Sequence, residues 1–308
     1  MNARLSGLST RSKVFLGLGG LIAVAIIIGI AFPSSGKNNK FQPQDEFRLP
    51  PWIKIKIGSV DLSINRAVFY LFLTSALTCW VMVYIGRRMQ QKPNKVQTAV
   101  EVSYDLARNN ITRGNLRDPG LSAKWFVFIA TLFFFIWFAN LVGYLPLPTN
   151  TQEHFNIFGL AIPTFAIYAA TANISIPLVL TLVVWFSYHV VGIRKHGFIG
   201  YLKTFVPGGI TGGAAIPLFV IEVISHMVRI ISLSVRLFAN ILAGHLLILF
   251  MAGGLVVLLG LPALGVFSVG ILAVPFYIFE VGLVATLQAF IFATLTSIYI
   301  GGAAAEGH

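Results

Sequence analysis

The sequence predicts an all-α polytopic membrane protein, and three observations lead to this fold class. Of the 308 residues, 56% are hydrophobic and only 10% are charged, whereas a soluble domain carries about 25% charged residues. The charged residues leave several uncharged stretches, each long enough for a helix to cross a bilayer core of about 30 Å. Cys79 is the only cysteine, which excludes a disulfide scaffold, and the apolar content excludes a disordered chain.

About six transmembrane helices are expected, and the first four follow the uncharged stretches in order. The first three spans are predicted at 14–32, 67–86 and 125–145. The next stretch, 157–193, is too long for one upright helix and is interrupted by proline. We therefore place the fourth span near 174–193, after an irregular approach.

The last two spans share the tract 204–305, which contains only four charged residues. A Gly-Leu-Pro sequence at 260–262 divides this tract into apolar segments of about 218–259 and 263–300. Each segment is about twice as long as a perpendicular helix needs to be, so it must tilt or be interrupted. The two segments predict a long, tilted helical hairpin.

The basic residues indicate the orientation in the membrane. Fourteen Lys and Arg residues fall on the side that carries both termini, and six fall on the other side, within 33–66. Both termini are therefore expected in the cytoplasm, and the net charge of +12 indicates topology rather than nucleic-acid binding. The segment 96–107, between basic flanks, is consistent with a helix on the cytoplasmic surface.

Two parts of the chain are expected. Residues 1–66 form an N-terminal anchor helix and an extracytoplasmic loop, and residues 67–308 form the main membrane domain. A signal peptide is the alternative for the first helix, although its apolar run is long and lacks a clear small-x-small cleavage site.

Six ionisable residues lie inside the last tract, where hydrocarbon makes them costly and a functional role is the first hypothesis. They are Glu222, His226, Arg229, Arg236, His245 and Glu280. On a helix, the first four and Asn240 fall within an arc of about 80°, with His245 off that face. The alternative is that such groups only snorkel or pair: Arg229 could pair with Glu222, and His226 could bond to a neighbour.

Arg236 is the residue least easily explained by pairing, because no carboxylate lies within two turns of it in the sequence. A guanidinium group stays protonated in a protein, so it attracts an anion and blocks a proton path. Glu222, His245 and Glu280 can instead accept and release protons. Together these residues suggest an ion path interrupted by an arginine barrier. No phosphate loop, nucleophile elbow or metal-ligand cluster appears, so no cofactor is expected.

The segment 232–245, SLSVRLFANILAGH, resembles subunit a of the rotary F-type ATP synthase. The arginine, the asparagine four residues later and the Ala-Gly ending recur in that family together with LQAFIF at 287–292. Further resemblance includes 134–146 with its Asn-Leu-Val-Gly pattern, and it extends over about 60–301. The resemblance implies that 67–308 is the proton-channel domain of a non-catalytic subunit, with its last two helices facing the c-ring.

The resemblance also implies roles for single residues. Arg236 resembles the essential stator arginine, and Asn240 and Gln288 resemble polar residues that line its surroundings. Glu222 resembles the carboxylate of the half-channel toward the cytoplasm.

Three positions depart from the common family pattern. His245 and Glu280 resemble a coupled pair of the other half-channel, with the acid and the histidine exchanged relative to some bacterial members. Asn173 stands where many members carry an acid, which puts a role for that position in doubt.

In the mechanism that the resemblance implies, protons enter one half-channel, neutralise a carboxylate on the rotor ring and leave through the other, while Arg236 prevents a direct leak. The implied partners are the c-ring, the peripheral stalk subunit b, other membrane-sector subunits and the lipid bilayer, with no nucleic acid. A bacterial cell (inner) membrane is favoured over the mitochondrial inner membrane.

Two alternatives to this function stay open. A self-contained proton-coupled transporter would use Arg236 to bind an anionic substrate, although no second copy of its polar stripe occurs in the first half of the chain. A structural membrane anchor would contain polar residues that only pair with one another.

Overall fold

The computed structural model describes residues 49, 51–57, 60–61, 63–90, 92–145, 154–157, 160–163, 169–206, 210, 212–251 and 273–305. Within this part of the chain, five helices are long and apolar enough to cross a membrane. The all-α polytopic class is therefore confirmed. The predicted first span at 14–32 and the breaker at 260–262 lie outside the described residues.

Helix α2 (Arg66–Arg87) is the first of these five spans. The Asn65 side chain accepts a hydrogen bond of 3.0 Å from the backbone N–H of Val68, which satisfies one of the free donors at the helix start. Short antiparallel pairs precede it: β1 (Pro51–Ile53) with β4 (Ile64–Asn65), and β2 (Lys56–Ile57) with β3 (Val60–Asp61). These strands were not predicted.

The segment expected to form a surface helix is helical: α3 (Lys95–Asp105) begins at an Asn94 cap and continues as the π-helical η2 (Leu106–Arg113). Its place on the cytoplasmic surface stays a prediction. The next span, α4 (Pro119–Gly143), begins with Asp118 as its cap and proline as its first residue. It contacts α2, η2 and the later elements η3 and α11, so it is a central helix of the described bundle.

An irregular segment separates α4 from the next span, as expected. It contains the antiparallel pair β5 (His154–Ile157) and β6 (Leu160–Pro163) and the 3₁₀ turn η3 (Ala170–Ala172). Helix α5 (Ser175–His196) follows, and Gly197, with a φ of 72°, makes the turn into the short helix α6 (Phe198–Lys203).

The two long segments predicted at the end of the chain are helical in their described residues, 218–251 and 273–300. After the 3₁₀ turn η4 (Gly212–Ala214), helix α7 spans Ala215–Leu249. The last span consists of α10 (Val274–Phe279), the π-helical turn η7 (Glu280–Val284) and α11 (Ala285–Ala304). The last span is therefore interrupted by a π-helical turn, which is one of the two outcomes that its length predicted.

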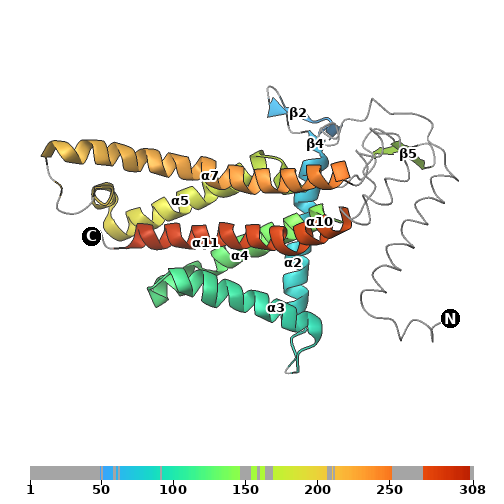
Figure 1. Ribbon diagram of the computed structural model, residues 1–308, viewed down its shortest axis with the longest axis horizontal. Coiled ribbons are helices and arrows are strands. Elements are labelled where there is room, and N and C mark those ends of the chain that lie inside the picture. Colours follow the sequence, from blue (N-terminus) through green and yellow to red (C-terminus); the bar gives the residue numbers. More distant parts are fainter. Residues whose placement is uncertain are drawn as a thin grey trace, which may run out of the picture. The chain divides into compact units, whose positions relative to one another are not determined.

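The chain divides into two compact units, one of 49–241 with 284–308 and one of 1–48 with 242–283. Within the first unit, α11 lies along α4 and α5 (Figure 1). The buried amide of Asn140 joins three elements there: its Nδ2 donates to the Ala285 carbonyl at 3.3 Å, and its Oδ1 accepts from Thr171 Oγ1 at 2.8 Å. At the other end of α11, Lys195 Nζ donates to the Ala304 carbonyl at 2.6 Å.

Candidate functional site

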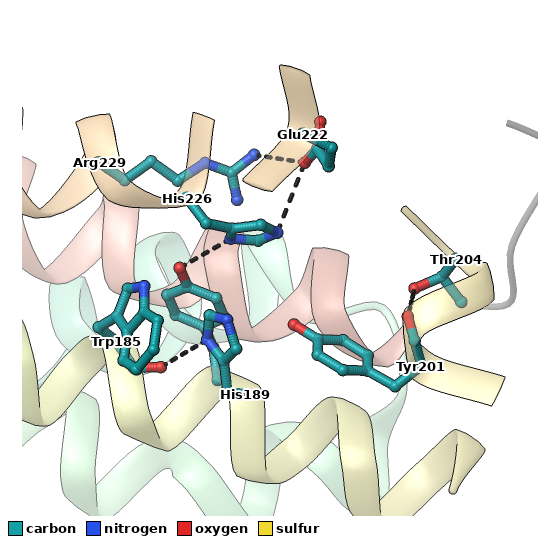
Figure 2. Close-up of polar contacts among 8 residues, drawn as sticks. Trp185, His189, Tyr201, Thr204, Glu222, His226 and Arg229 are labelled. Carbon is teal, nitrogen blue, oxygen red and sulfur yellow. Dashed lines mark hydrogen bonds and ion pairs between the residues drawn. The ribbon is translucent and has the colours of Figure 1, made fainter. Parts of the chain in front are cut away.

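The first part of α7 carries a cluster of three ionisable side chains. The Oε1 atom of Glu222 lies 3.4 Å from Arg229 Nη2 and 3.5 Å from His226 Nε2. Figure 2 shows both side chains reaching the same carboxylate. The expected pairing of Arg229 with Glu222 is thus present. Both distances are long for hydrogen bonds, so charge attraction contributes most of the interaction with Arg229.

Helix α5 brings a second set of polar side chains to this cluster. Tyr188 Oη and His226 Nδ1 share a hydrogen bond of 2.9 Å, and both residues are buried. The ring of His189 lies 5.0 Å from the ring of His226, and its Nδ1 donates to the Trp185 carbonyl at 2.9 Å. His226 therefore contacts Glu222, one turn away on its own helix, and also forms a hydrogen bond across to α5.

Of these side chains, Tyr188, Glu222, His226 and Arg229 line a cavity of about 470 Å³ between α5, α6, α7 and the end of α11. Arg229 covers one wall, with its guanidinium 5.1 Å from the ring centroid of Tyr299 on α11. Tyr201, on α6, is 4% exposed, and its phenol oxygen has no hydrogen-bond partner among the described residues. In Figure 2 this oxygen points toward His189 and His226.

The surroundings of Tyr201 fit a cavity that contains water. Burial raises the pKa of its phenol to about 12, with Arg229 lowering it and Glu222 raising it to smaller extents. A buried hydroxyl without a partner costs free energy, and a water molecule in a polar cavity of this size would satisfy it. The arrangement can therefore hold a hydrogen-bonded chain of water between α6 and the Glu222 carboxylate.

Arg236 lies two helical turns beyond Arg229 on α7, in a different environment. Its side chain is exposed, and among the described residues it forms no hydrogen bond or ion pair. Val235 and Ala239, beside it, are also exposed. A guanidinium without a counter-ion among the described residues is costly on a spanning helix, so Arg236 is suited to attract an anion.

The predicted polar neighbours of Arg236 bind to each other. Asn240 Nδ2 donates to Gln288 Oε1 at 2.8 Å, which joins α7 to α11. Gln288 is buried, and its Nε2 has no hydrogen-bond partner within the described ranges. The structure therefore joins the two amides to each other. Asn240 lies one turn beyond Arg236 on α7, and the role of the two amides beside Arg236 stays a prediction.

The other two predicted site residues fall in the second unit. His245 lies on α7 and Glu280 begins η7, and they are 6% and 7% exposed. Both are buried ionisable side chains within spanning helices, where such groups are costly.

The polar stripe predicted on α7 is divided between two environments. Glu222, His226 and Arg229 line the cavity, whereas Arg236 and Asn240 are exposed. The sequence analysis missed Tyr188, His189 and Tyr201, because it counted only ionisable groups in the last tract. The adjacent Tyr188 and His189, two polar side chains within an apolar span, could have indicated a polar site on α5.

Comparisons with known proteins identify the family of the chain. A family model described as "ATP synthase A chain" matches residues 68–301. Proteins named ATP synthase subunit a from Brucella ovis, Brucella canis and Brucella suis are each 34% identical to the chain over 275 residues. Each match covers 86% of this chain and 98% of the relative.

Proposed function

Because the chain belongs to the ATP synthase A chain family, we propose that Arg236 is the electrostatic barrier between two aqueous half-channels, which carry protons to and from a carboxylate on a neighbouring rotor ring. The family makes the chain a multi-pass membrane subunit of ATP synthase that takes part in proton transport. ATP synthesis itself would take place in other subunits, so this chain would be a non-catalytic subunit of the ATP synthase complex.

The observation that carries the proposal is that Arg236 is exposed and has no counter-ion in the described part of the chain. Its charge is permanent, so the anion must come and go while the arginine stays. A deprotonated rotor carboxylate would be held by Arg236, and a protonated, neutral one could leave and turn through the lipid. The same positive charge repels protons, which prevents a leak between the half-channels.

The cavity at Glu222 supports one half-channel. It is lined by titratable side chains and lies near the basic residues Arg194, Lys195 and Lys203, which the charge pattern assigns to the cytoplasm. A proton released from the ring would pass to the Glu222 carboxylate and then through water to the cytoplasm.

His245 and Glu280 support the other half-channel. A proton that passes between two ionisable side chains leaves the total charge of the pair unchanged. The proton gradient and the membrane potential, worth about 2.3 kcal/mol per charge per 100 mV, would drive entry on this side.

The proposal implies defined partners and a membrane. The chain would contact the c-ring through the exposed face around Arg236, and the peripheral stalk subunit b and other membrane-sector subunits elsewhere. Its relatives come from Brucella, so the bacterial cell (inner) membrane is the proposed location.

Proton pumping tests the role of Arg236. Vesicles that contain the assembled complex would be energised with ATP, and the wild type compared with Arg236→Ala, Arg236→Lys and the control Arg88→Ala. Arg88 bonds to Tyr84 on the exposed end of α2 and lies outside the site. Pumping should be lost in Arg236→Ala with the complex intact on a gel, and retained in the control.

The other outcomes separate the competing functions. Unchanged pumping in Arg236→Ala would exclude the barrier role and favour a transporter. Loss of assembly in Arg236→Ala, with normal pumping by the few complexes that do form, would indicate a structural anchor.

A further inference from the structure

A second cavity lies away from the proton path, between η2 and the start of α4. Its volume is about 460 Å³, within the range of small-ligand sites. The side chains that decide its chemistry are Tyr104, Arg108, Arg113, Arg117, Ser122 and Phe126. Three guanidinium groups thus surround one space, and no carboxylate lines it.

The three arginines have no acidic partner in the described part of the chain. Arg113 Nη1 donates to the Asn109 amide oxygen at 3.2 Å, and Arg108 lies 5.9 Å from the centroid of the Phe126 ring. The nearest acids along the sequence are engaged elsewhere: Asp105 accepts from the Asn109 amide, and Asp118 caps α4. Arg108, Arg113 and Arg117 are exposed at this cavity, so an anion placed between them would be attracted by all three guanidinium groups.

The charge pattern of the sequence predicts that the cavity lies near the membrane surface. Lys124 is the last charged residue before the uncharged part of α4, and the cavity wall includes residues on both sides of it. Tyr104 and Phe126 meet there edge to face, with ring centroids 5.2 Å apart. Aromatic and basic side chains together are typical of the level of lipid headgroups.

We infer that this cavity binds the headgroup phosphate of an anionic phospholipid of the cytoplasmic leaflet. Guanidinium groups match phosphate oxygens in pairs of hydrogen bonds, and basic pockets beside spanning helices are suited to acidic headgroups. Phe126 and Leu116 supply an apolar wall against which the first carbons of the acyl chains can lie. Free phosphate has the same negative charge but no acyl chains to contact that apolar wall. This site is separate from the proton path and does not depend on it.

Lipid binding to the assembled, delipidated complex tests the inference. Phosphatidylglycerol would be titrated in detergent, and the bound lipid counted by native mass spectrometry. The triple variant R108Q/R113Q/R117Q should lose about fivefold in affinity for each arginine, or roughly a hundredfold in all. The control K92Q/K95Q/K203Q removes the same charge from the same predicted side but outside the cavity, and should bind as the wild type does.

Each of the other outcomes overturns the inference. An equal loss in both triple variants would show general attraction to positive charge, and equal binding of phosphatidylcholine would show no need for an anionic headgroup. Displacement of the lipid by millimolar inorganic phosphate would indicate a free-phosphate site.

A single variant keeps the test usable if the triple variant fails to assemble. Arg117 forms no hydrogen bond or ion pair with the described residues, so Arg117→Gln removes a cavity charge without breaking a contact. It should weaken phosphatidylglycerol about fivefold, and unchanged binding would contradict the inference.

Discussion

His226 shows at the residue scale how a histidine inside the membrane is supported. It lies between Glu222 on its own helix and the Tyr188 hydroxyl on α5. Its ring is therefore fixed at both nitrogen atoms, and it connects the ion pair on α7 to the aromatic side chains of the cavity.

Replacing Tyr188 by phenylalanine should lower stability, because it leaves His226 Nδ1 buried without its partner. The expected cost is about 0.5–2 kcal/mol, the range for hydrogen bonds between membrane helices. Thermal unfolding in detergent measures it. Ser187→Ala is the matched control, because the Ser187 hydroxyl bonds only to Val183 of its own helix. An equal effect of both changes would mean that the bond between the helices contributes nothing.

His245 and Glu280 allow a test by exchange. If they share one water-filled path, His245→Glu with Glu280→His should recover more ATP-driven pumping than either single change, because the pair then keeps one acid and one base. The measurement is ATP-driven pumping by vesicles that contain the wild type, either single variant or the double variant. Strictly additive losses would argue that the two residues do not interact.

At the scale of the helices, close approach between α5 and α6 holds the cavity wall. Gly192 lies directly against the Tyr201 ring, and an added Cβ would overlap that ring. The ring can lie there only because residue 192 has no side chain. A single hydrogen atom on α5 thus determines where the phenol on α6 is placed.

Gly192→Ala should therefore displace Tyr201, destabilise the protein by about 1–3 kcal/mol and reduce proton flow. Gly86→Ala is the control, because nothing lies within 4 Å of its added Cβ on α2. Alanine there should be neutral or stabilise by up to about 1 kcal/mol. Unfolding and ATP-driven pumping measured together check both changes; a Gly192→Ala protein with wild-type values of both would exclude the role given to this contact.

The sequence located the helices well where charge and turn residues mark their ends. The spans predicted at 67–86 and 174–193 match α2 and α5 within three residues. In contrast, α4 begins at Pro119, six residues before the predicted start at 125, because Lys124 marks the membrane border and not the helix end. The π-helical turns were missed, since one extra residue in a turn leaves no hydrophobic period to detect.

The site was predictable only along single helices. Spacing on α7 correctly placed Arg229 near Glu222, two turns away. It could not show that Tyr188 and Tyr201 complete the cavity, because contacts between helices depend on packing and not on separation in the chain.

For the molecule as a whole, the spanning helices expose many large apolar side chains, and the residues alone do not say whether lipid or protein covers them. Val235 on α7 and Val183 on α5 have nearly equal exposed fractions, 41% and 43%. The proposed function distinguishes them: Val235 would face the rotor ring, and Val183 would face lipid or a less tightly packed protein surface.

Tryptophan at these two positions should therefore act differently. Val235→Trp should lower ATP-driven pumping about tenfold, because a protein interface tolerates overpacking poorly. Val183→Trp should change it little, since lipid chains rearrange around the larger ring. Equal tolerance at both sites would argue against a ring on the Arg236 face.

The bond from Lys195 to the last carbonyl of α11 has a practical consequence. It anchors the end of that helix, and Gly302, Ala303 and Ala305 form part of the wall of the Glu222 cavity. A fluorescent protein or affinity tag fused directly after Ala305 would emerge beside the cavity mouth and obstruct it. Labels for single-molecule work are better placed on the exposed residues of α3, such as Val102, which is not part of this wall.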